Sequence, residues 1–208
     1  MGKRLSIGKQ RSIGKRGAVL VAGWVLISAA IVALVRVQMG VAPYDVLNTA
    51  IAKQFDIAAG TASWLACAVL VMVAWLLGVR PGIGTIAGAV VVGGCINAGL
   101  TVIEVVDLFP VRVALFIVAL GVMYLGVCCI ILSGIGAGPT ELVTLGLMRH
   151  NAPIGAARWA VEGVCLALGV VLGGSFGVGT LVILAVSGPT LAFLLPRVGR
   201  VLGLSIDR

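Results

Sequence analysis

Long, nearly uncharged apolar runs constrain this chain more than any other feature. A helix of about 20 apolar residues crosses a hydrocarbon core of about 30 Å. Hydrophobic residues fill 61% of the 208 positions, and 11% are charged. Only helices and closed barrels satisfy their backbone in lipid, and barrel strands alternate apolar with polar residues. Continuous runs therefore predict an all-α polytopic membrane protein with six spans: 18–37, 60–79, 83–102, 111–133, 156–174 and 178–195.

The basic residues predict an orientation. Six of the fifteen lysines and arginines precede residue 17. Six spans with a cytoplasmic amino terminus place twelve basic residues inside and three outside, as the positive-inside rule favours. The segment 1–17 is then a basic tail attracted to anionic lipid headgroups rather than a nucleic-acid arm. Residues 196–208 form a second cytoplasmic tail, and both termini lie in the cytoplasm.

Two shorter segments leave the number of spans open. If residues 44–55 and 140–150 also crossed, eight spans would satisfy the basic-residue count as well. Twelve residues make only about 18 Å of helix, however, which favours short helices that do not span.

The chain predicts neither a metal site nor a disulfide framework. Its five cysteines lie in apolar runs, and the one histidine, His150, has no cysteine partner at metal-ligand spacing. There is no nucleophile–base pair to indicate an enzyme. We expect no cofactor and no catalytic residue.

The two halves of the chain repeat one order of motifs. At an offset of 96 residues, Gly40, Pro43 and Asp45 align with Gly136, Pro139 and Glu141. Further along the chain the offset is 95 residues. There Trp64 aligns with Trp159, and the motif GIGT (82–85) aligns with GVGT (177–180). Each half reads as span, Gly-x-x-Pro-x-acid segment, span, Gly-x-Gly-Thr turn, span. The halves are 18–102 and 111–195, joined by an external linker at 103–110. Three spans per half is an odd number, so the second half is predicted to be inverted relative to the first.

The glycine–proline breaks predict short helices that start inside the membrane. Glycine permits unusual backbone at the break, and proline suits the first turn of a helix. Each acid would then lie near the third helical position, where the amino-terminal dipole favours negative charge. Matched interruptions in inverted repeats indicate a transport site. The predicted lining comprises Gly40, Pro43, Tyr44, Asp45, Asn48, Gly136, Pro139, Thr140, Glu141 and Thr144.

Simpler interpretations stay open for these acids. Asp45 and Glu141 could merely cap short interfacial helices at opposite surfaces. Glu162 is a secondary candidate because ionisable residues in spans are costly, yet Arg158 lies one turn before it and offers local pairing. The small-residue faces at Gly84 and Gly169 would serve internal packing or a homodimer.

The motifs Gly-x-x-Pro-x-Asp, GTASW and RPGIGT resemble the YczE/YyaS/YitT family of bacterial integral membrane proteins, the YczE branch above all. The resemblance runs from about residue 18 to 195. It implies a bacterial plasma-membrane protein of five or six spans, with small-molecule export proposed for some relatives. The second half departs from the pattern with Thr140, Glu141 and SFGVGT.

Together these features predict a small-molecule secondary transporter or exporter, with the two acids carrying protons or cations. The alternative is a non-transporting membrane scaffold that recruits a cytoplasmic partner through its basic tail. A membrane enzyme is the weakest of the three.

Overall fold

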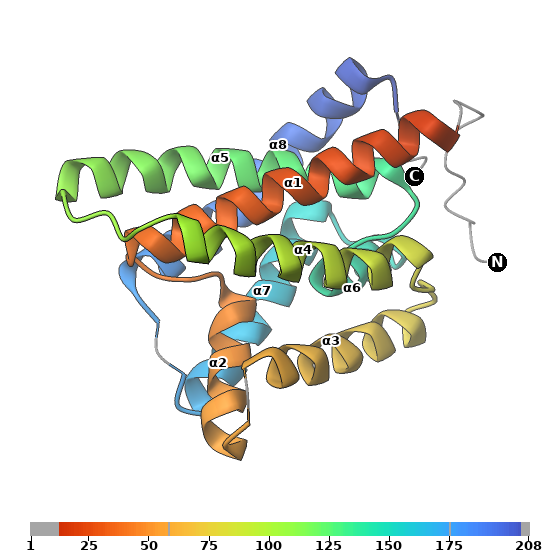
Figure 1. Ribbon diagram of the computed structural model, residues 1–208. Coiled ribbons are helices and arrows are strands. Elements are labelled where there is room, and N and C mark those ends of the chain that lie inside the picture. Colours follow the sequence, from red (N-terminus) through yellow and green to blue (C-terminus); the bar gives the residue numbers. More distant parts are fainter. Residues whose placement is uncertain (1–12, 58, 175, 205–208) are drawn as a thin grey trace.

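The computed structural model describes residues 13–57, 59–174 and 176–204, and the described chain is helical throughout, without strands (Figure 1). Its eight helices are α1 (Ile13–Val37), α2 (Pro43–Phe55), α3 (Ala59–Leu76), α4 (Ile83–Val102), α5 (Phe109–Ser133), α6 (Pro139–Arg149), α7 (Ile154–Val171) and α8 (Val178–Leu202). Most of the predicted basic tail, residues 1–12, lies outside the described residues.

Five of the six predicted spans are confirmed as helices long and apolar enough to cross a bilayer: α1, α4, α5, α7 and α8. The segment predicted at 60–79 forms α3, which ends at Leu76 because the chain turns at Gly78 in the left-handed region, at φ +83°. Its fully described apolar stretch is Thr61–Leu76, so a crossing by α3 stays a prediction. The two glycine–proline segments form the short helices α2 and α6, as predicted.

The centre of the molecule is an antiparallel pair, α1 and α5, which lie side by side in Figure 1. They cross at two glycines. A Cβ on Gly23 would lie 2.7 Å from Ile130 Cγ1, and a Cβ on Gly126 would lie 2.7 Å from Ile27 Cγ1. Small residues let membrane helices approach closely where lipid provides no hydrophobic drive for association. Glycine is therefore required at both points of the crossing.

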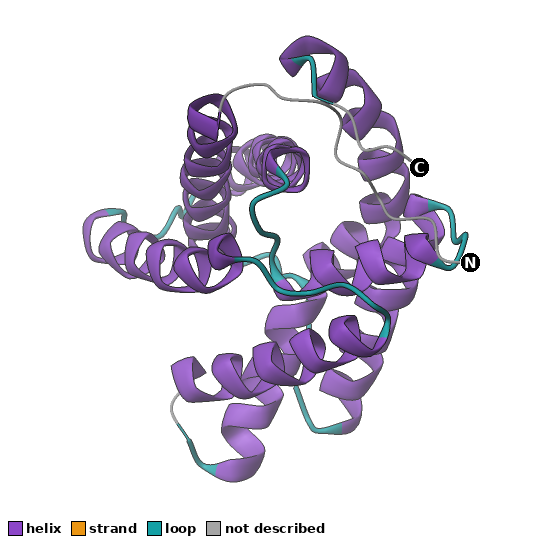
Figure 2. Cartoon of the chain, turned by 90° about the vertical axis from the view of Figure 1, so that its right-hand side faces the viewer, coloured by secondary structure: helices purple, strands orange, loops and turns teal. Residues whose placement is uncertain are grey.

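The remaining helices pack around this pair in matched contacts. α4 packs on α1 and α8 packs on α5. α2 packs on α3 and α7, while α6 packs on α7 and α3. Figure 2 shows the described chain as helices joined by loops, and in Figure 1 α2 runs across the direction of α1 and α4. This arrangement brings the amino-terminal ends of α2 and α6 into the interior of the bundle.

Each glycine–proline break lies against the Gly-x-Gly-Thr turn of the other half. Gly40 has φ +138°, and a Cβ there would lie 2.6 Å from the Thr180 backbone nitrogen. A Cβ on Gly136 would lie 2.4 Å from the Thr85 nitrogen. The Met39 carbonyl accepts a 2.8 Å hydrogen bond from Gly179 N–H, and the Thr85 hydroxyl accepts one of 3.3 Å from Ala137 N–H. The broken backbone is thus satisfied by protein, as burial in a membrane requires.

Candidate functional site

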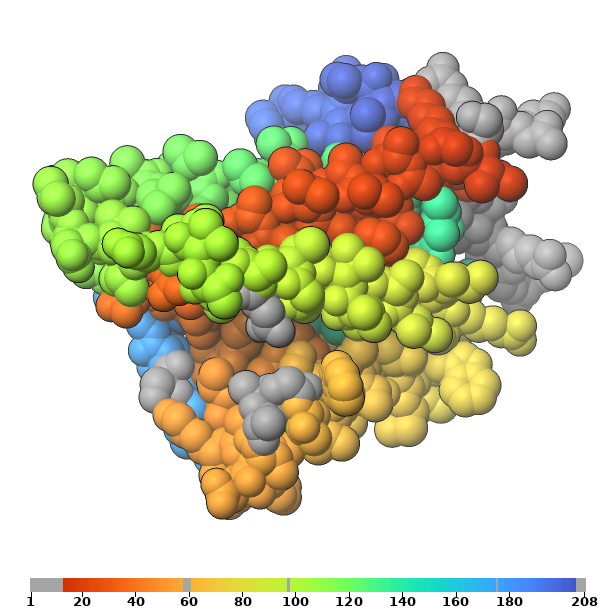
Figure 3. Space-filling model, viewed as in Figure 1, coloured from red at the N-terminus to blue at the C-terminus, as the bar shows by residue number. Residues whose placement is uncertain are grey.

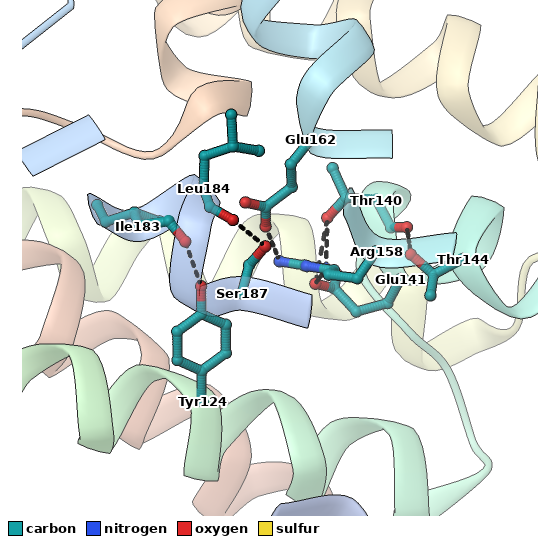
Figure 4. Close-up of polar contacts among 9 residues, drawn as sticks. All are labelled: Tyr124, Thr140, Glu141, Thr144, Arg158, Glu162, Ile183, Leu184 and Ser187. Carbon is teal, nitrogen blue, oxygen red and sulfur yellow. Dashed lines mark hydrogen bonds and ion pairs between the residues drawn. The ribbon is translucent and has the colours of Figure 1, made fainter. Parts of the chain in front are cut away.

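A buried arginine on α7 joins two carboxylates in the interior (Figure 4). Arg158 Nη1 lies 2.6 Å from Glu141 Oε1, and Arg158 Nη2 lies 2.6 Å from Glu162 Oε1. The three residues are between 3% and 8% exposed. Buried charges persist where they are paired and hydrogen-bonded, because unpaired ones carry a large desolvation cost. We call Arg158, Glu141 and Glu162 the charge cluster.

Glu141 reaches the cluster from the first turn of α6. Pro139 occupies the first helical position and Gly138 is the N-cap residue, so Glu141 stands at the third position, as predicted. The helix N-terminus favours its negative charge. Its Oε2 atom lies too close to the position of a Cβ on Gly138 for both to fit, so a side chain at residue 138 would displace the carboxylate.

Hydroxyl groups from three further positions surround the cluster. Thr140 Oγ1 lies 3.1 Å from Glu141 Oε1 and 3.4 Å from Arg158 Nη1, and Thr144 donates to the Thr140 carbonyl at 2.8 Å. Ser187 of α8 is fully buried beside the Arg158–Glu162 pair, and its hydroxyl donates to the Leu184 carbonyl. These groups complete a polar interior between α6, α7 and α8.

The matching part of the first half carries an acid without a cation. Pro43 is the first residue of α2, which places Asp45 at the third position, as predicted. Its side-chain partner is the amide of Asn48, at 3.5 Å, and it forms no ion pair among the described residues. At the 95-residue offset Ser63 and Cys67 replace Arg158 and Glu162. Asp45 therefore faces neutral partners, whereas Glu141 is held by a guanidinium.

Tyr44 makes the first-half counterpart of the Thr140–Arg158 contact. Its hydroxyl donates to the Ser63 carbonyl on α3 at 3.1 Å. Asp45 also lies within electrostatic range of Glu162. The two short helices therefore direct their acids toward the same polar interior, where Arg158 pairs with Glu141 and Glu162 but not with Asp45.

Not every residue of the predicted lining lies in this interior. Gly40 and Gly136 contact the Gly-x-Gly-Thr turns instead of the charge cluster, and Pro43 and Pro139 begin α2 and α6. The secondary pair, Arg158 and Glu162, proves to be joined directly to Glu141.

Some polar atoms of the site have no hydrogen-bond partner within the described part of the chain. They are Glu162 Oε2, Asn48 Oδ1 and Arg158 Nε. Such atoms are costly in a low-dielectric interior unless a proton or a ligand satisfies them. The described residues contain no group of three or more histidine, cysteine or acidic side chains arranged for a metal ion.

Tyr124 is the residue near the site that sequence reasoning missed. It is 1% exposed in the middle of α5, and its hydroxyl donates to the Ile183 carbonyl of α8 at 3.2 Å. It lies within electrostatic range of all three residues of the charge cluster. One signal could have indicated it, because only two tyrosines occur in the chain and this one interrupts an apolar run.

The fold and site define a helical membrane protein with a charge cluster enclosed by its long and short helices. The chain belongs to DUF6198, a family of unknown function, whose profile matches residues 14–196. It is also 28% identical over 166 residues to an uncharacterized protein of Haemophilus influenzae, an alignment that covers 78% of this chain and 75% of the relative. No solved structure matches the chain.

Proposed function

We propose that this protein is a small-molecule secondary transporter or exporter with its site at the charge cluster. The observation that carries the proposal is the burial of Arg158, Glu141 and Glu162 among apolar helices. Ionisable residues inside a membrane are expensive, and they mark substrate and ion pathways. A scaffold that acts through its basic tail has no need of them.

The proposal includes two inverted repeats, 18–102 and 111–195. The antiparallel α1–α5 pair supports this, as do the matched contacts of α4 with α1 and α8 with α5. In transporters with this organisation, sites lie at the repeat interface and are built by interrupted helices.

The pairing of the acids divides their roles. Arg158 binds Glu141, which anchors α6 to α7. Asp45 has only a 3.5 Å contact with Asn48, and Glu162 keeps one oxygen without a partner among the described residues. These two carboxylates are the better carriers of an exchangeable proton or cation. The polar neighbours Tyr44 and Thr140 shape the site.

The remaining topology belongs to the same proposal. The basic residues favour cytoplasmic termini, and the resemblance to the YczE branch favours a bacterial plasma membrane. We include α3 as the sixth span, with the bilayer thinned locally or the flanking side chains extended toward the headgroups.

Flux in proteoliposomes tests the function directly. We would measure uptake and efflux of a small-molecule panel by the wild type and by the variants Asp45→Asn and Glu141→Gln. Asp56→Asn and Glu104→Gln are matched controls, because both acids are exposed outside the cluster. We expect Asp45→Asn to abolish coupled flux and both controls to retain it.

Two outcomes would reject the proposal. Flux that survives both Asp45→Asn and Glu141→Gln would remove these two acids from the mechanism. Absence of flux for the whole panel, together with loss of a cellular phenotype on deletion of residues 1–16, would favour the scaffold instead.

A further inference from the structure

The two halves differ in one helix contact. α7 and α8 pack against each other, whereas their counterparts α3 and α4 make no comparable contact in the described part of the chain. Figure 3 shows a furrow between α4 and α3 on this face. Every other major contact between helices has a counterpart in the opposite half or joins the equivalent helices α1 and α5.

Glycine and tryptophan residues show the difference atom by atom. A Cβ on Gly188 of α8 would lie 2.7 Å from the Gly155 carbonyl oxygen and 2.9 Å from the Trp159 indole. The counterpart of Gly188 at the 95-residue offset is Gly93, around which a Cβ would meet nothing within 4 Å. The counterpart of Trp159 is Trp64, and the two are 47% and 73% exposed. The same motif is therefore engaged in the second half and disengaged in the first.

The acids follow the same asymmetry. Glu141, beside the closed α7–α8 pair, is 8% exposed. Asp45, on the helix that packs against α3, is partly exposed. The residues before them agree, since Thr140 is buried and Tyr44 is only partly so. The open helix pair and the more accessible acid belong to the same half.

We infer that the interior is entered between α3 and α4 on the Asp45 side in this state, and that α3 closes on α4 as α7 parts from α8 in the opposite state. The inference rests on the proposed inverted repeats. In the opposite state Trp64 packs on Gly93, as Trp159 packs on Gly188 here. Glu141 then becomes the accessible acid and Asp45 the buried one.

A sequence difference between the two halves explains why α7 packs on α8 in this structure, whereas α3 makes no comparable contact with α4 among the described residues. Pro189 has no N–H for the Ala185 carbonyl one turn earlier, and Trp159 Nε1–H donates to that carbonyl at 3.2 Å. Gly94 replaces this proline in the first half, so the carbonyl of Val90 already has a helical donor. In the opposite state, the contact between α3 and α4 therefore lacks the tryptophan hydrogen bond and is weaker than the contact between α7 and α8.

Paired cysteines can lock either state. In a protein whose five native cysteines are replaced, Gly155→Cys with Ala192→Cys is the first lock. A Cβ at position 155 lies 3.8 Å from Ala192 Cβ, within the usual disulfide range of about 3.5–4.5 Å. The counterpart pair at the 95-residue offset is Gly60→Cys with Asn97→Cys. Single-cysteine variants and reversal by a reducing agent control for misfolding.

Labelling with a water-soluble thiol reagent reads out the accessible side. Each lock is combined with Tyr44→Cys or Thr140→Cys, and the reagent is added after oxidation. We expect both disulfides to form, the 60–97 pair more slowly. With the 155–192 lock, position 44 should react and position 140 should be protected, and the 60–97 lock should invert that ratio.

Several results would overturn the inference. The first is a 155–192 disulfide that forms while no 60–97 disulfide forms. The second is equal labelling of positions 44 and 140 under both locks. The third is a disulfide between position 60 of two chains, which would make the α3–α4 face a homodimer contact. Inverted labelling without flux of any compound would reject the transport function but support the two conformational states. Flux without inverted labelling would reject only the access route.

Discussion

Replacement of Arg158 by glutamine should destabilise the protein strongly. The guanidinium is 5% exposed and bonds two carboxylates at 2.6 Å each. Removal of one partner from a buried ion pair costs about 3–5 kcal/mol, because the remaining charge stays buried without compensation. For a chain of this size, each kcal/mol lowers the melting temperature by about 2–4 °C. The expected decrease is therefore roughly 6–20 °C.

Thermal unfolding in lipid nanodiscs, followed by far-UV circular dichroism, measures this decrease. Arg80→Gln is the matched control, because Arg80 is exposed and a surface substitution changes stability by about 0.5 kcal/mol or less. Arg158→Lys should recover part of the lost thermal stability, since lysine restores the positive charge but lacks the planar guanidinium that can bind two carboxylates at once. Joint replacement of Glu141 and Glu162 by glutamine in the Arg158→Gln background should recover more, because no buried charge then remains. An Arg158→Gln protein as stable as the control would refute the reasoning.

Three further predictions concern packing and backbone, and thermal unfolding measures each. Gly126→Ala places a methyl group against α1 and should cost about 1–3 kcal/mol, whereas Gly121→Ala, with open space around its Cβ, should cost nothing comparable; equal effects would contradict the tight crossing. Tyr124→Phe removes the hydroxyl bonded to α8 and should cost about 0.5–1.5 kcal/mol, so an unchanged midpoint would show that bond to be unimportant. Gly40→Ala should cost clearly more than Gly173→Ala, because both have positive φ but only Gly40 faces backbone within 3 Å.

The charge cluster shows how far local spacing can identify a site. The interval between Arg158 and Glu162 indicates an i, i+4 pair on one helix, and the structure contains that pair. Local spacing says nothing of Glu141, seventeen residues earlier on α6, which binds the same guanidinium. The repeat alignment identified Glu141 by a different route. Only their meeting in space turns two separate candidates into one site.

The sequence alone determined the helices and where they break. Hydropathy and length indicate six spans because lipid requires continuous apolar helix, and five of them are helices long and apolar enough to cross. Glycine followed by proline marks the start of α2 and α6 because these residues constrain their own backbone. Only the tertiary structure decided which faces meet: Gly23 and Gly126 at one crossing, the breaks with the opposite turns, and α7 with α8, with no comparable α3–α4 contact among the described residues. The physical reason is that lipid solvates every apolar face equally, so close packing and polar contacts select the partners, and hydropathy records neither.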